Sequence, residues 1–83
     1  MTIAILYELA NFKGKSFVLK SDDLNLADDG WDNRVSSMIV FDGSLTAYKD
    51  AGYGGESKSF SEGKHYWVGS SWDDEISSVD LWM

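Results

Sequence analysis

The chain of 83 residues contains no cysteine and a single histidine, His65. It therefore forms no disulfide, and it cannot build a zinc site from cysteines or from a cluster of histidines. A domain of this size buries only about 60% of the surface of its unfolded chain, so its stability is marginal. Without disulfides or zinc, a metal ion held by oxygen ligands is one of the few remaining means of stabilising it.

Long apolar runs and basic residues are also scarce. No run of about 18 apolar residues occurs, which argues against a transmembrane helix. The 14 Asp and Glu residues outnumber the seven Lys and Arg residues, which gives a formal charge of −7. This charge argues against nucleic acid and anionic membranes as partners and suits a protein that holds cations. The N-terminus lacks the basic segment of a signal peptide, so we expect none, and the cellular compartment stays open.

Motifs typical of enzymes and of two common ligand-binding loops are missing. No nucleophile elbow accompanies the single histidine, so we expect no enzymatic activity and no catalytic residues. The glycine-rich run at residues 52–55 lacks the lysine and the strand–loop–helix context of a phosphate-binding loop. Residues 28–32 lack the alternating acids and the late glutamate of an EF-hand.

The sequence does contain an internal repeat with an offset of 41 residues. The aligned pairs are Tyr7 with Tyr48, Phe12 with Tyr53, Gly14 with Gly55, Trp31 with Trp72, and the serines 36–37 with 77–78. Each unit is too long for one hairpin and too short for an independent domain. We therefore predict a single domain, residues 1–83, built from two motifs that span residues 1–42 and 43–83.

The residue pattern predicts β-strands and no helix of useful length. Each half opens with β-type residues (3–7 and 45–48), continues after the glycine turn (16–19 and 57–60), and closes with a segment rich in β-branched and aromatic residues (35–41 and 76–82). About forty residues accommodate four short strands. Eight short strands without helices pack most economically as two antiparallel sheets face to face.

Alternation and the repeat indicate which side chains form the core. In the second closing strand, apolar residues flank Asp80, so Asp80 should face water. By the repeat, Met38 and Val40 should face the core while Ile39 faces outward. Trp31 and Trp72 are expected in the core or at its rim, and we also expect Trp67 and Trp82 to be core residues.

Two loops with the same order of oxygen-bearing residues precede the closing strands. Residues 32–37 read Asp-Asn-Arg-Val-Ser-Ser, and residues 73–78 read Asp-Asp-Glu-Ile-Ser-Ser. Calcium binds six to eight oxygens from carboxylates, amides, hydroxyls, carbonyls and water, which such loops supply. The same residue types also make ordinary turns by capping backbone N–H groups. Because both loops follow a tryptophan at matching points of the repeat, ion binding is the favoured interpretation.

The two hexapeptides resemble the double-clamp calcium motif of microbial βγ-crystallin domains, which reads Asn/Asp, Asn/Asp, two variable residues, Ser/Thr, Ser. The spacings from Tyr7 to Gly14 and from Tyr48 to Gly55 resemble the aromatic corner of that family's first hairpin. The resemblance covers essentially the whole chain. It implies an all-β fold, a β-sandwich of two Greek-key motifs with pseudo-twofold symmetry, and two calcium ions at one end, each shared between the motifs.

The resemblance also implies which residues would bind calcium. In the family, one motif supplies a main-chain carbonyl from the third position and a hydroxyl from the fifth. The other motif supplies an acidic side chain from its first position, and the residue after the corner tyrosine adds oxygen. Carried over, the ligands are Glu8, Asp32, the Arg34 carbonyl, Ser36, the Lys49 carbonyl, Asp73, the Glu75 carbonyl and Ser77. Asn33 and Asp74, at the second position, are expected to make hydrogen bonds within the loops.

The sites implied by the resemblance are unequal. Glu8 offers a carboxylate, whereas Lys49 offers only its backbone carbonyl and places a cation near its site. We therefore expect the site that includes Lys49 to be the weaker, and we expect the Arg34 side chain to point to solvent. The expected function is calcium binding by a monomer, with calcium stabilising the fold. The alternative is a non-enzymatic interaction module (an inhibitor, toxin-like or coat component) in which calcium is incidental and the protein partner is open.

Overall fold

The computed structural model describes residues 3–22, 26, 30–31 and 34–82. The elements are β1 (Ile3–Leu9), the 3-10 turn η1 (Ala10–Phe12), β2 (Lys13–Leu19), β3 (Ser37–Phe41), β4 (Ser44–Asp50), β5 (Gly54–Phe60), β6 (Gly63–His65) and β7 (Ser78–Trp82). The described residues thus contain seven strands where the sequence predicts eight. The segment that the repeat aligns with β6 lies mostly outside the described residues. No helix of the described part has the length and apolar character needed to cross a membrane.

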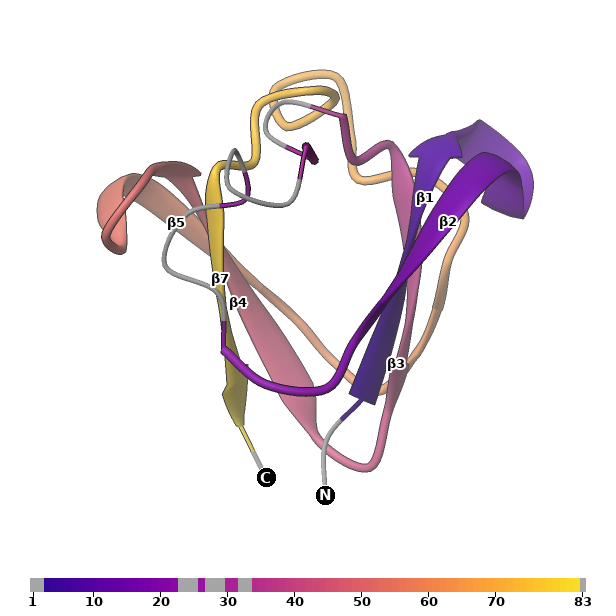
Figure 1. Cartoon of the computed structure of the whole chain (residues 1–83), viewed down its shortest axis with the longest axis horizontal. Helices are drawn as coiled ribbons and strands as arrows, with labels where there is room; N and C mark the ends of the chain where they lie inside the picture. The colour runs from indigo at the N-terminus through magenta and orange to yellow at the C-terminus, as the bar shows by residue number, and fades with distance from the viewer. Residues whose placement is uncertain (1–2, 23–25, 27–29, 32–33, 83) are drawn as a thin grey trace.

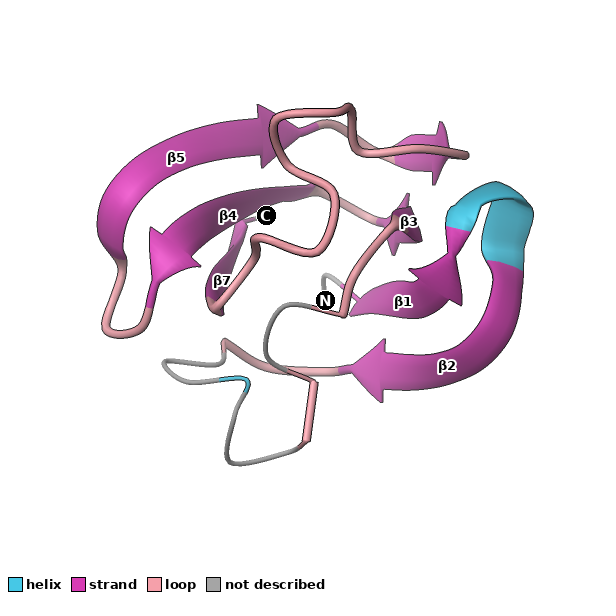
Figure 2. Ribbon diagram, turned by 90° about the horizontal axis from the view of Figure 1, so that it is seen from above, coloured by secondary structure: helices cyan, strands magenta, loops and turns pink. Residues whose placement is uncertain are grey.

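The strands form two sheets, with the orders β2-β1-β3-β6 and β5-β4-β7 (Figures 1 and 2). All pairings are antiparallel, and β6 from the second half lies beside β3 of the first. In the second sheet, the Asp22 carboxylate accepts a hydrogen bond of 2.7 Å from the Leu81 N–H. The repeat aligns this pair with Gly63 and Val40, where β6 meets β3, so each half contacts the closing strand of the other. The predicted all-β sandwich of two Greek-key motifs with pseudo-twofold symmetry is confirmed.

The pairing registers repeat between the two halves. Tyr7 lies opposite Ser37 where β1 meets β3, and Tyr48 lies opposite Ser78 where β4 meets β7. Both hairpins, β1–β2 and β4–β5, carry an irregularity just after the tyrosine. The 41-residue offset of the sequence is therefore also the offset of the structure.

The core lies between the sheets and includes Leu26 and Val35 from the described part of the segment before β3, and Trp72 and Ile76 from the loop before β7. Its buried apolar residues are Ala4, Leu6, Leu19, Leu26, Val35, Met38, Val40, Leu45, Ala47, Phe60, Val68, Trp72, Ile76 and Val79. The alternation in the closing strands is as predicted, because Met38, Val40 and Val79 are buried whereas Ile39 and Asp80 are partly exposed. Val35 and Ile76 are fully buried, so each hexapeptide is anchored at its fourth residue.

The four tryptophans divide into two pairs. Trp72 is buried, and Trp31 packs at the rim of the core with its ring stacked on Phe17 at 5.7 Å. Trp67 and Trp82, by contrast, are 47% and 52% exposed, so the prediction that they are core residues is wrong. Trp82 has the same parity as Asp80 along β7 and therefore faces outward, where its indole N–H donates to the Thr46 hydroxyl. Trp67 lies on the loop that follows β6.

Asp80 faces outward from β7 beside Asp22, and this pairing has a consequence for stability. Burial, the nearby Asp22 charge and a hydrogen bond with Asp22 raise the pKa of Asp80 above its ordinary value of 3.8. A carboxyl whose pKa is raised by folding is destabilising when ionised, and this penalty disappears as the pH falls through the folded-state pKa. We therefore expect Asp80→Asn to raise the melting temperature at pH 7 and to have a shrinking effect toward pH 3. Thermal melts between pH 3 and pH 7 measure this effect, and Glu62→Gln, which removes a charge from an exposed acid, is the control. A gain in melting temperature that is equal at pH 3 and at pH 7 would contradict the prediction.

Candidate metal centre

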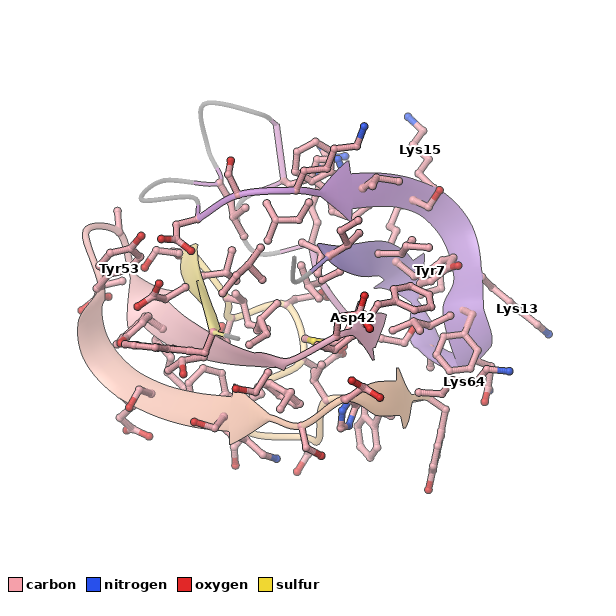
Figure 3. All side chains as sticks on the ribbon, turned by 90° about the horizontal axis from the view of Figure 1, so that it is seen from below. Tyr7, Lys13, Lys15, Asp42, Tyr53 and Lys64 are labelled. Atoms are coloured by element: carbon pink, nitrogen blue, oxygen red, sulfur yellow. The ribbon has the colours of Figure 1, made fainter. Side chains whose placement is uncertain are left out.

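Each first hairpin turns back on itself at an aromatic corner. The Tyr7 and Phe12 rings meet edge to face with centroids 5.6 Å apart, and the Tyr48 and Tyr53 rings lie 5.2 Å apart. Figure 3 shows Tyr7 and Tyr53 at opposite sides of the molecule, one in each corner. Phe12 and Tyr53 both have positive φ angles, 59° and 61°, which the folded-over hairpin imposes. The glycine two residues further on suits both corners, because Gly14 and Gly55 have φ angles of 79° and 73°, which L side chains rarely adopt.

The last serine of each hexapeptide holds the corner of its own motif. The Ser37 hydroxyl accepts from the Phe12 N–H at 3.1 Å and donates to the Leu9 carbonyl at 2.6 Å. The Ser78 hydroxyl makes the same two bonds with Tyr53 and Asp50, at 3.1 and 2.6 Å. Both serines are fully buried, so the sixth position has a structural role that the sequence interpretation missed.

The fifth-position serine brings the first loop beside the end of β1. The Ser36 N–H donates to the Tyr7 carbonyl at 2.9 Å, which places Ser36 next to Glu8. Glu8 Oε2 lies 3.6 Å from Arg34 Nη1, so the Arg34 side chain, expected in solvent, forms an ion pair while remaining 54% exposed. Glu8, Arg34 and Ser36, predicted to serve one site, are thus adjacent.

The second loop reaches into the same region. The Ser36 hydroxyl donates to Asp74 Oδ1 at 3.3 Å, and the Asp74 N–H donates to the Val35 carbonyl at 3.2 Å. Asp74 adopts a left-handed conformation with φ 57°, which lets its N–H and its carboxylate both face the first loop. Figure 1 shows residues 34–36 of the first loop and residues 73–77 of the second at the top of the sandwich, opposite the start of β1 and the end of β7. The two motifs therefore contact each other through the hexapeptides.

Asp73, the residue before Asp74, carries a buried side-chain oxygen. Its Oδ1 is buried and makes no hydrogen bond within the described part of the chain. A buried carboxylate oxygen without a donor is costly, and native structures rarely keep one without a functional reason. A cation beside Asp73 would satisfy it, so the donor set here fits a metal ion.

The second site repeats this arrangement in part. The Ser77 N–H donates to the Tyr48 carbonyl at 2.9 Å, which places Ser77 beside Lys49, and the Glu75 N–H donates to the Trp72 carbonyl. Lys49 Nζ lies 3.8 Å from Glu56 Oε2 and 5.3 Å from the centroid of the Trp72 ring. The lysine cation is thus held by its own neighbours. Asp32 and Asn33, the acid and amide expected to complete the centre, lie outside the described residues.

The donors available here are mixed in kind. Within residues 3–22, 26, 30–31 and 34–82, no three Asp, Glu, His or Cys side chains gather into a metal-binding cluster. An ion held at the junction would therefore depend on main-chain carbonyls and serine hydroxyls as well as carboxylates. Such an all-oxygen set of mixed donors is the coordination chemistry of calcium rather than of zinc.

The structure consists of two Greek-key motifs, with β6 of the second motif paired with β3 of the first. Comparisons with known proteins identify the class to which this architecture belongs. The sequence profile of the family Beta/Gamma crystallin matches residues 3–80, and the chain belongs to this family. A beta/gamma-crystallin from Ciona intestinalis is 38% identical over 79 residues, which cover 90% of this chain and 92% of that protein.

Solved structures agree with the sequence comparison. The beta gamma crystallin from Ciona intestinalis superposes with a TM-score of 0.87 at 34% identity, covering 96% of this chain and 99% of that one. A betagamma-crystallin from an archaeon gives a TM-score of 0.88 at 32% identity and covers 98% of both chains. The vertebrate relatives are longer, because the aligned part is 28% of Beta-crystallin B1 from Rattus norvegicus, which is 32% identical over 74 residues. The descriptions of these relatives all name crystallins.

Proposed function

We propose that this chain is a non-catalytic calcium-binding domain that holds two Ca²⁺ ions in sites shared between its motifs, and that calcium stabilises the fold. The observation that carries the proposal is the buried Asp73 Oδ1, which has no hydrogen-bond donor among the residues that the structure describes. It lies in the loop that contacts the Ser36 hydroxyl of the other motif. A divalent cation at this junction would satisfy the orphaned oxygen and join the two motifs.

The first site would use the Arg34 carbonyl, the Ser36 hydroxyl, Glu8 and Asp73. Three of these belong to the first motif and lie side by side at the end of β1, as the Tyr7–Ser36 hydrogen bond and the Glu8–Arg34 ion pair require. Asp73 comes from the second motif. Bound calcium would supply positive charge among Glu8, Asp73 and Asp74, and would replace their mutual repulsion with attraction.

The second site would use the Glu75 carbonyl, the Ser77 hydroxyl, the Lys49 carbonyl and Asp32. The backbone around Ser77 repeats that around Ser36, because the Tyr48 carbonyl accepts from Ser77 as the Tyr7 carbonyl accepts from Ser36. The main difference is the lysine where the first site has Glu8. The second site is therefore proposed as the weaker of the two.

Calcium binding of this kind has a large effect on a small domain. A ligand that binds only the folded state at one hundred times its dissociation constant adds about 2.7 kcal/mol to the free energy of unfolding. Two sites together would be comparable to a large part of the roughly 5–15 kcal/mol that stabilises a typical domain. Calorimetric titration with calcium, together with thermal melts in calcium and in chelator, tests the proposal.

One observation favours the alternative function, an interaction module with incidental calcium. Tyr66 and Trp67 are adjacent in the loop after β6, and they expose 66% and 47% of their surfaces. Exposed neighbouring aromatic residues are typical of binding surfaces. A melting temperature that does not respond to calcium would favour this alternative.

Replacing Lys49 with Glu is expected to raise the calcium affinity of the second site by at least about tenfold, since it exchanges a cation for an anion beside the ion. Isothermal titration calorimetry measures the change. Lys64→Glu, at an exposed position on β6, makes the same change of charge away from the loops and serves as the control. An unchanged affinity at both sites of the Lys49 variant would contradict the assignment.

A further inference from the structure

We propose that Arg34 is a built-in counter-cation of the first calcium site: its guanidinium neutralises Glu8 in the calcium-free chain, and calcium must displace it. This inference rests on the proposed calcium function and adds a residue that sets the affinity and selectivity of one site. Arg34 then has two opposed roles, because its carbonyl is a proposed ligand and its side chain is the competitor.

The geometry separates these two roles within one residue. The Arg34 N–H donates to the Trp31 carbonyl at 3.3 Å, and the next residue, Val35, is fully buried, so the backbone of Arg34 is fixed. Its side chain is 54% exposed and reaches Glu8 Oε2 at 3.6 Å. The guanidinium can therefore leave Glu8 without moving the carbonyl.

The acidic residues around the first site explain why the Arg34 guanidinium would stabilise the calcium-free chain. Glu8 pairs with Arg34 of the first loop, Asp74 accepts a hydrogen bond from Ser36 of the same loop, and the residue before Asp74, Asp73, adds a buried oxygen. These carboxylates, all within the described part of the chain, do not form a compact cluster, but their like charges on adjoining segments repel one another in the absence of calcium. Among the described residues, the ion pair with Arg34 is the one that brings a cation to any of these three acids.

The second half of the chain provides an internal comparison, because the charges are exchanged there. The repeat places Glu75 at the position of Arg34 and Lys49 at the position of Glu8. Lys49 pairs with Glu56, on the neighbouring strand β5, and lies over Trp72. Among the described residues its ion pair is with Glu56 and not with an acid of either hexapeptide, so we assign the counter-cation role to the first site.

A tethered cation also affects which ions the site accepts. The Arg34 guanidinium is attached next to Glu8, so it competes at a high effective concentration. A monovalent ion gains too little from the site to displace it, whereas a divalent ion gains about twice the attraction. The first site should therefore discriminate against sodium and potassium more strongly than it would without Arg34.

A double-mutant cycle with Arg34→Gln, Glu8→Gln and the double variant tests the proposal, because Gln retains the backbone carbonyl. We expect Arg34→Gln to raise the first-site calcium affinity about fivefold, the upper range for an exposed ion pair, and to weaken selectivity against 150 mM sodium, a concentration near physiological ionic strength (~0.15 M). Calorimetry measures affinity, and thermal melts in chelator measure the calcium-free state, which Arg34→Gln should destabilise. In the Glu8→Gln background, Arg34→Gln should change both quantities far less.

Lys64→Gln removes one positive charge from exposed β6 and is the matched control for a general charge effect. The counter-cation role is overturned if Arg34→Gln matches this control, or if its effect is equal with and without Glu8. If the wild-type chain binds two ions but Arg34→Gln changes nothing, only this inference fails. If the wild-type chain binds no calcium, the proposed function fails and the counter-cation role fails with it.

Discussion

Replacing Asp73 with Asn is expected to raise the melting temperature of the calcium-free chain and to lower that of the calcium-loaded chain. Without calcium, the variant replaces a buried carboxylate oxygen, which has no donor within the described part of the chain, by a neutral amide that is less costly to bury. With calcium, it loses the acidic ligand of the first site. Loss of one site occupied at one hundred times its dissociation constant removes about 2.7 kcal/mol, which for a domain of this size is roughly 10–20 °C.

Thermal melts in chelator and in calcium, with calorimetry for the stoichiometry, check this opposite pair of effects. We expect the number of bound ions to fall from two to one. Glu62→Gln removes one negative charge from an exposed position and controls for the change in net charge. Melting temperatures that move in the same direction with and without calcium would contradict the role of Asp73.

Replacing Ser78 with Ala should destabilise the domain by roughly 2–4 kcal/mol whether calcium is present or not. The hydroxyl joins the Tyr53 N–H to the Asp50 carbonyl, and Ser78 is fully buried, so its removal leaves two backbone groups without that partner. Each buried polar group left unsatisfied costs about 1–3 kcal/mol. In a domain with a marginal free energy of unfolding, this is a large fraction of the total.

Urea denaturation in chelator and in calcium measures the effect. Ser37→Ala should behave alike, since Ser37 makes the equivalent bonds to Phe12 and Leu9. Ser57→Ala, at an exposed position on β5, is the control and should change little. A loss that appears only in calcium would mean that the sixth position acts as a ligand, contrary to the structural role assigned here.

The fold could be predicted from the sequence because its two strongest signals, the internal repeat and the alternation of apolar residues, can be seen without knowing any tertiary contact. The 41-residue offset aligned Tyr7 with Tyr48, and the structure places each opposite the last serine of its own loop. Alternation oriented the closing strands correctly and placed Met38 in the core. The same alternation places Trp82 on the outward face with Asp80, so the exposure of Trp82 could also have been predicted from the sequence.

The site could be predicted less completely, because it depends on contacts between distant residues. A serine in an acidic loop has the same sequence signature whether its hydroxyl binds an ion or holds a hairpin. The family resemblance singled out Ser36 as a ligand, but the role of Ser37 in holding the hairpin is visible only from its bonds to Leu9 and Phe12 in the structure. Likewise, Arg34 and Glu8 are 26 residues apart, and the pairing of β1 with β3 brings them together.

The central claim is that two calcium ions bind at the junction of the two loops. Isothermal titration of the purified chain with calcium in low-salt buffer, with magnesium as the control ion, tests it most directly. We expect two calcium ions per chain with unequal affinities, and one ion after Ser77→Arg, which places a cation at the weaker site. A chain that binds no calcium, or a Ser77→Arg variant that still binds two ions, would contradict it.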